Sequence, residues 1–175
     1  MNGTRKLTYT AVGAAISAVC VFLTNFGWLK VSLLMFAALC YYIVFVKCGF
    51  LHGLADIAVS MLVAFFALGI TPLSSAFLLN ALIFAPFSVL CYFIRKLYYT
   101  KWQTALIRIA AMIVFANISL VCVWFTAKWI VTIDIVGMAA NIGGYPVLAL
   151  LFTFMALVFD LLFNQLSIRL CKLIK

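Results

Sequence analysis

Gly49-Phe-Leu-His-Gly53-Leu-Ala-Asp56 opens the first of two consecutive apolar runs, Gly69-Ile-Thr-Pro72 separates them, and Arg95-Lys96 closes the second. Each run has about 20 residues, enough for a helix to cross roughly 30 Å of bilayer hydrocarbon. Glycine and proline interrupt helices, and proline suits a first helical turn, so the break predicts a tight turn. The sequence therefore predicts a transmembrane hairpin. Asp56 would lie about two turns inside its first helix, where a carboxylate is costly without a partner.

The whole composition is that of an integral membrane protein. The chain has 175 residues, of which 69% are hydrophobic and 9% charged, whereas soluble domains are about 25% charged. Four further apolar runs, near residues 7–26, 31–46, 104–128 and from 145 onward, complete an all-α set of six transmembrane helices. The first run exceeds a signal-peptide core and is expected to remain as a span. We therefore expect one six-helix transmembrane domain over residues 1–175, with Pro86 kinking the fourth helix.

The positive charges predict the orientation of these spans. The formal net charge is +9, but the basic residues gather in connecting segments instead of forming a stripe that would suit nucleic acid. One side of the membrane would hold Arg5, Lys6, Lys47, Arg95, Lys96, Lys101, Arg108, Arg169, Lys172 and Lys175, and the other only Lys30 and Lys128. Cytoplasmic loops carry the excess of Lys and Arg, so both termini are expected in the cytoplasm.

The sequence lacks the residues that several classes of membrane enzyme and ATPase require. It contains no glutamate, a single histidine (His52) and no phosphate-binding P-loop. An intramembrane metalloprotease needs His and Glu ligands, and a serine hydrolase needs a base beside its nucleophile. The six cysteines show no CxxC spacing and suit small apolar packing positions. We therefore expect no catalytic site, no metal and no cofactor.

The membrane carboxylates Asp56 and Asp160 call for partners. Arg108, Lys47 and His52 lie at comparable predicted depth, and His52 shares a helix face with Asp56 because the two are four residues apart. The sequence predicts a buried ion pair between Asp56 and Arg108, or an Asp56–His52 pair, that locks helices together. Ion coupling and a role at a partner interface are the other interpretations.

Two further patterns are candidates for recognition. Polar and aromatic residues gather toward the outer ends of the spans: Trp28, Lys30, Thr71, Ser74, Ser75, Asn80, Asn117, Ser119, Trp124, Lys128, Asp134, Asn141 and Tyr145. Singly these residues suit interfacial anchoring, but together they could form a pocket for a flat polar molecule. On the first span, Ala11, Ala15 and Ala18 form a stripe of small residues, which suits close helix packing within the chain or against another subunit.

With these motifs, the chain resembles the substrate-binding S-components of energy-coupling factor (ECF) vitamin transporters. The resemblance covers nearly the whole chain. It rests on the alanine-striped first span after Lys6, on Gly49-x3-Gly53-x2-Asp56, on Gly69-x2-Pro72, on the basic segment after the fourth span and on the basic C-terminal tail.

The resemblance implies a bacterial cytoplasmic-membrane protein that captures a vitamin-like molecule at the outer face. It implies delivery inward together with a membrane T-component and two ATPase subunits, with Ala11, Ala15 and Ala18 at the T-component interface. It also implies a ligand site of Trp28, Lys30, Asn80, Asn117, Trp124, Lys128, Asn141 and Tyr145.

The chain differs from the family in the charged side chains that would bind a ligand. It places no glutamate and no arginine in the predicted outer half, so the vitamin is not specified. Lys30 and Lys128 could pair with a carboxylate or a phosphate on a ligand. A structural membrane protein of similar six-span shape, such as an MreD-like scaffold, is the alternative. Such a scaffold would need no outer pocket and would use the alanine stripe against its partner.

Overall fold

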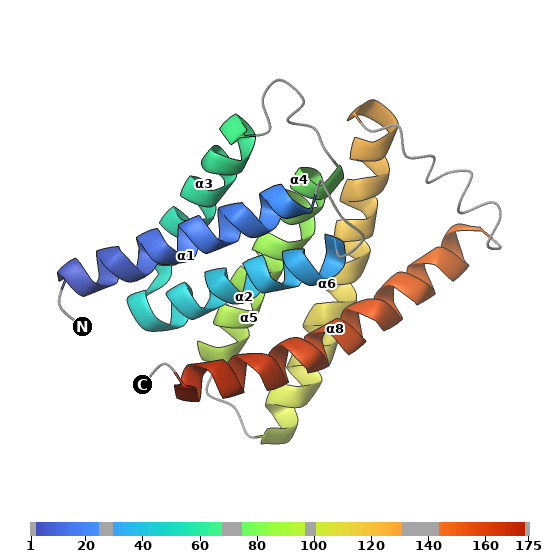
Figure 1. Cartoon of the computed structure of the whole chain (residues 1–175). Helices are drawn as coiled ribbons and strands as arrows, with labels where there is room; N and C mark the ends of the chain where they lie inside the picture. The colour runs from blue at the N-terminus through green and yellow to red at the C-terminus, as the bar shows by residue number, and fades with distance from the viewer. Residues whose placement is uncertain (1–2, 25–29, 68–74, 97–100, 131–143, 174–175) are drawn as a thin grey trace. The chain divides into compact units, whose positions relative to one another are not determined.

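The computed structural model describes residues 3–24, 30–67, 75–96, 101–130 and 144–173, and these residues are almost entirely helical (Figure 1). Nearly every segment is an α-helix, and one short segment, η1, is π-helical. The helices are α1 (Gly3–Leu23), α2 (Lys30–Cys48), α3 (Phe50–Ala67), α4 (Ser75–Leu79), η1 (Asn80–Phe84), α5 (Ala85–Lys96), α6 (Lys101–Ile130) and α8 (Tyr145–Leu173).

The prediction of an all-α membrane protein with six spans is confirmed. Within the described ranges, six stretches are long and apolar enough to cross a bilayer. They are Gly3–Leu23, Val31–Cys48, Phe50–Ala67, Phe77–Lys96, Gln103–Thr126 and Tyr145–Leu170. The fourth span is built from α4, η1 and α5 in succession. The chain is therefore a multi-pass membrane protein.

Two compact units make up the chain. One contains Met1–Phe93 with Leu170–Lys175, and the other contains Ile94–Arg169. The first unit thus holds α1 to α4, η1 and most of α5, and the second holds α6 and most of α8. The sequence predicts one six-helix domain, and that single-domain organisation stays a prediction.

In the first unit, α1, α2 and α3 pack against one another in all three pairings. The buried side of α1 consists mainly of small residues, namely Thr10, Gly13, Ala14, Ser17, Ala18 and Val21. Small side chains let helix backbones approach closely inside a bilayer, where no hydrophobic force between helices drives association. The larger side chains of this core come from α2, whose Leu34, Tyr41 and Phe45 are fully buried.

The connection between α2 and α3 explains the glycines of the Gly49-x3-Gly53 motif. Gly49 has a φ of 101°, a left-handed conformation that glycine adopts without a Cβ penalty. Its N–H donates to the carbonyl of Phe45 at 3.1 Å, which caps the end of α2. A Cβ at Gly53 would overlap the Phe45 ring. The two glycines of the motif therefore let the chain turn between α2 and α3 and let the start of α3 pack closely against Phe45 of α2.

The fourth span contains a π-helical turn directly before Pro86. The N–H of Ala85 donates to the carbonyl of Asn80, five residues earlier, and Pro86 follows directly. Proline has no N–H to donate and its ring crowds the preceding turn, so a wider turn before it relieves the crowding. The sequence predicts a kink at Pro86; the structure shows a π-helical turn directly before it, and the kink itself stays a prediction. The predicted turn at Gly69–Pro72 lies outside the described residues.

Candidate functional site

The second unit carries a line of side-chain contacts between α6 and α8. Arg108 contacts Asp160, Asn117 contacts Thr153, and Trp124 contacts Tyr145. Later residues of α6 meet earlier residues of α8, so the two helices run antiparallel. Arg108 and Trp124 are 16 positions apart in the sequence, or about 24 Å along a helix. The contacts therefore reach most of the way across a bilayer.

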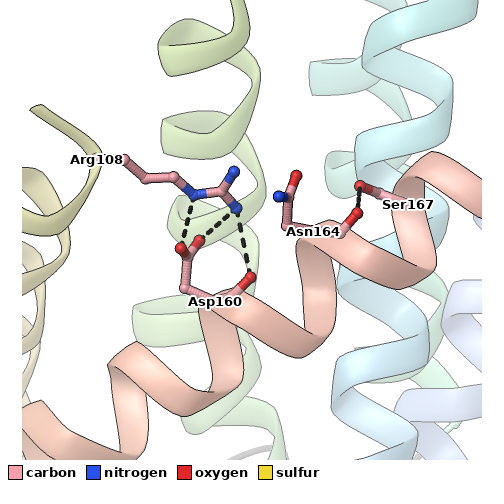
Figure 2. A network of polar contacts seen from close by, with 4 residues as sticks. All are labelled: Arg108, Asp160, Asn164 and Ser167. Carbon is pink, nitrogen blue, oxygen red and sulfur yellow. Dashed lines mark hydrogen bonds and ion pairs between the residues drawn. The ribbon is translucent and has the colours of Figure 1, made fainter. Parts of the chain in front are cut away.

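The strongest of these contacts is the ion pair between Arg108 and Asp160 (Figure 2). Arg108 Nε donates to Asp160 Oδ2 at 2.6 Å, and Nη2 donates to Oδ1 at 2.7 Å. Nη2 also lies 3.4 Å from the main-chain carbonyl oxygen of Asp160. A planar guanidinium that binds both carboxylate oxygens gives a pair with defined geometry as well as charge neutrality. This pair fixes the position of α8 relative to the first turns of α6.

A pocket of about 430 Å³ lies beside this ion pair. Its polar lining comes from Thr104, Arg108, Asp160 and Asn164, and its apolar lining from Ala105, Ile109 and Leu161. Figure 2 shows Asn164 one turn beyond Asp160 on α8, where the main-chain carbonyl of Asn164 accepts a hydrogen bond from the hydroxyl of Ser167 at 2.9 Å. The guanidinium and the carboxylate neutralise one another, so the pocket is polar without a net charge from this pair.

At the other end of the line, Trp124 and Tyr145 make an aromatic contact. Their ring centroids lie 5.7 Å apart at an interplanar angle of 87°, the edge-to-face arrangement that ring quadrupoles favour. Two turns earlier on α6, the Asn117 amide donates to the carbonyl of Ile113 at 2.8 Å and lies 3.5 Å from the Thr153 hydroxyl. This end combines aromatic surface with an amide, a combination that suits a heteroaromatic ligand.

Of the predicted ligand set, the structure thus brings Trp124 and Tyr145 into contact, and it places Asn117 two turns earlier on α6, against Thr153 of α8. Asn80 lies in the other unit, fully buried, and its amide donates to Tyr41 Oη at 3.1 Å and to Met61 Sδ at 3.5 Å. Lys30 begins α2 and Lys128 lies in the last turn of α6. Trp28 and Asn141 fall outside the described residues.

Sequence reasoning did not pick out Thr153. Thr153 lies seven positions before Asp160 and therefore on the same face of α8. A polar residue on the same face as an ionisable membrane residue could have been predicted to face another helix.

The predicted pairing of Asp56 with Arg108 stays a prediction, since the two residues lie in different units. Arg108 pairs with Asp160, whereas neither Asp56 carboxylate oxygen has a hydrogen-bond partner among the described residues. His52 does not bind Asp56 either, since its Nδ1 lies 3.4 Å from the hydroxyl of Thr10. Membrane depth alone allowed each of these pairings. The choice among them depends on which helix faces meet, and depth does not specify that.

The alanine stripe of α1 is divided between two environments. Ala11 and Ala15 are exposed, together with Val12, Ile16 and Val19. Ala18 is only 3% exposed and packs inside the first unit. The exposed part of the stripe is therefore the part that another subunit could contact.

Comparison of the chain with protein-family models, curated proteins and solved structures found no match. A functional proposal therefore rests on the physical features of the chain itself, such as the polar and aromatic contacts of α6 and α8 and the exposed alanines of α1.

Proposed function

We propose that the protein is the substrate-binding S-component of an ECF-type importer in a bacterial cytoplasmic membrane. In this proposal it captures a vitamin-like small molecule near the outer face. A membrane T-component and two ATPase subunits then drive delivery to the cytoplasm. Both termini lie in the cytoplasm, as the distribution of Lys and Arg favours.

The observation that carries the proposal is the aromatic and amide end of the α6–α8 line. Trp124 and Tyr145 stand edge to face, and the Asn117 amide lies on the same pair of helices. Trp124 is only partly buried, so its ring retains surface for a ligand. A ring system can pack on tryptophan, and an amide oxygen can accept a hydrogen bond from the polar edge of such a ligand. The proposed site includes Lys128, in the last turn of α6, because a lysine can pair with a ligand carboxylate or phosphate.

The exposed alanines of α1 support the transport part of the proposal. Ala11 and Ala15 leave a shallow stripe between larger exposed side chains such as Val12 and Ile16. A helix of a T-component could approach this stripe to backbone contact distance. In this assignment Ala18 packs within the protein and takes no part in docking.

Native mass spectrometry of the protein purified from its host membrane tests the proposal directly. We expect a small molecule of vitamin size to remain bound, and we expect it to be lost or weakened in Trp124→Ala. Phe125→Ala is the matched control, because Phe125 is adjacent but 62% exposed. Co-purification with a T-component and ATPase subunits would support the complete importer.

The same experiment distinguishes the alternative. A protein without a small molecule, purified together with a membrane partner but no ATPase, would overturn the importer and favour an MreD-like scaffold. Equal ligand retention in Trp124→Ala and Phe125→Ala would remove Trp124 from the site while leaving a ligand-binding function in place.

A further inference from the structure

Asp56 is a carboxylic acid enclosed in the first unit without a polar partner. Its residue exposure is 0%, and both carboxylate oxygens lack a hydrogen-bond partner in the part of the chain that the structure describes. It lies on α3, inside a span that is long and apolar enough to cross the bilayer. Buried polar groups are normally hydrogen-bonded, so an orphaned carboxyl in this setting calls for an explanation.

The main chain of α1 closes directly over this carboxyl. A Cβ built at Gly13 would lie 3.2 Å from both Asp56 oxygens and 2.7 Å from Val44 Cγ2. Glycine at this position therefore lets α1 approach Asp56 as closely as van der Waals contact allows. The carboxyl therefore faces helix backbone on the α1 side, and the aliphatic side chain of Val44 from α2 packs at the same glycine. Neither neighbour balances a negative charge.

The surrounding ionisable groups do not supply a counter-ion by hydrogen bonding. On α2, Cys40, Tyr41 and Cys48 lie within electrostatic range of Asp56 and are neutral in their ordinary protonated forms. Tyr41 is already bonded to Ser60 Oγ at 2.9 Å, and His52 faces Thr10. Lys6 of α1 lies within range of Cys48, Lys47 is in the last turn of α2, and α4 contains no ionisable residue. No cation donates a hydrogen bond to Asp56 among the described side chains.

Protonation would neutralise the buried Asp56 carboxyl without any movement of the helices. An ionised carboxylate in a low-dielectric interior is expensive, and such a group neutralises itself when no partner is available. A metal cation would need several oxygen ligands and space around it. The α1 backbone at Gly13 occupies that space on one side of the carboxyl. A proton requires no extra volume.

We propose that Asp56 is a proton-binding site that holds α1, α2 and α3 together. The carboxyl is protonated while the three helices are packed. Loss of the proton to water leaves a carboxylate against the α1 backbone, which weakens the packing of α1 on α3. The site goes beyond the proposed transport function, because it does not depend on a substrate or on a second subunit.

Infrared spectroscopy of the purified full chain tests whether Asp56 holds a proton. The chain has three acidic side chains, Asp56, Asp134 and Asp160, so a protonated carboxyl band can be assigned with few variants. At neutral pH we expect such a band in the wild type, with a shift to lower frequency in D2O. Asp56→Asn should remove the band, and the matched control Asp160→Asn should retain it. A wild type without the band, or a band that persists in Asp56→Asn, would overturn the proposal.

Thermal unfolding at a series of pH values tests the link to helix packing. We expect the wild-type melting temperature to fall as the pH rises, because deprotonation is then forced on the packed state. Asn resembles the protonated carboxyl in size and is neutral, so Asp56→Asn should fold and lose most of this pH dependence. Asp160→Asn should keep the wild-type slope even if its stability is lower. Equal slopes in the wild type and Asp56→Asn would refute the link, and the presence of the infrared band in the wild type is tested without either variant.

Discussion

Removal of Arg108 is the sharpest test of how α6 and α8 are held together. Arg108 makes two charge-assisted hydrogen bonds to Asp160, at 2.6 Å and 2.7 Å. The Asp160 side chain is 7% exposed and the Arg108 side chain 23%. In Arg108→Met the aliphatic stem is largely kept, but Asp160 loses the guanidinium that neutralises it.

The expected cost follows from this burial. Breaking a buried ion pair by removing one partner costs about 3–5 kcal/mol, because a charge is left without compensation. Water reaches part of Arg108, so we expect the lower end, about 3 kcal/mol. In the double variant Arg108→Met/Asp160→Leu neither charge remains to be desolvated. It should therefore recover about 2 kcal/mol relative to Arg108→Met.

Unfolding in mixed micelles of mild detergent and dodecyl sulfate, followed by circular dichroism, measures these free energies. Arg169→Met is the matched control, since Arg169 is exposed and lies on α8 as well. It should change the stability little. A double variant as unstable as the sum of its two single variants would refute the argument. In that case Arg108 and Asp160 would contribute independently, without a pair between them.

Three further substitutions test other features. Gly53→Ala inserts a methyl into the Phe45 ring and should cost about 1–3 kcal/mol in the same micelle assay; unchanged stability would show that the α2–α3 corner can open freely. Ala15→Trp should leave folding and ligand retention intact and abolish vitamin uptake by cells with the full importer, since it blocks helix approach; normal uptake would move docking away from α1. Trp124→Ala should weaken ligand binding by about 1–3 kcal/mol in a calorimetric titration, and an unchanged affinity would place the ligand elsewhere.

Hydropathy and helix punctuation were sufficient to predict the six spans. Apolar runs of spanning length are required by a bilayer whatever the neighbours are, so local sequence determines them. The left-handed conformation of Gly49 was not among the predictions, although it is a local requirement that glycine meets without a Cβ penalty. At Pro86 the sequence predicts a kink, and the π-turn before it was not predicted, because its formation depends on how the neighbouring turn packs.

The lateral contacts were harder to predict than the spans. Arg108 could have met Asp56 or Asp160 at similar depth, and only helix rotation and neighbour order decide in favour of Asp160. The alanine stripe shows the same limit. Ala18 shares the helical spacing of Ala11 and Ala15 but lies at the edge of the buried face, where packing with α2 and α3 covers it. The helical spacing of small residues does not show which of them lie on the buried face of a helix and which lie just beside it.

The π-turn at Asn80–Phe84 has a consequence for how sequences of this kind evolve. A π-turn accommodates one residue more than the α-helical turn it replaces, which is equivalent to a single-residue insertion within a continuous helix. Each α-helical residue turns the helix by about 100°, so an extra residue in a regular α-helix would rotate everything after it by that amount. The π-turn takes up the extra residue instead, so the buried side of α5, including Ser88 and Cys91, keeps its direction. Deletion of one residue within this segment would return the span to regular α-helix and leave α5 facing its present neighbours. A relative that lacks one residue here would accordingly need few compensating changes in side-chain size along α5.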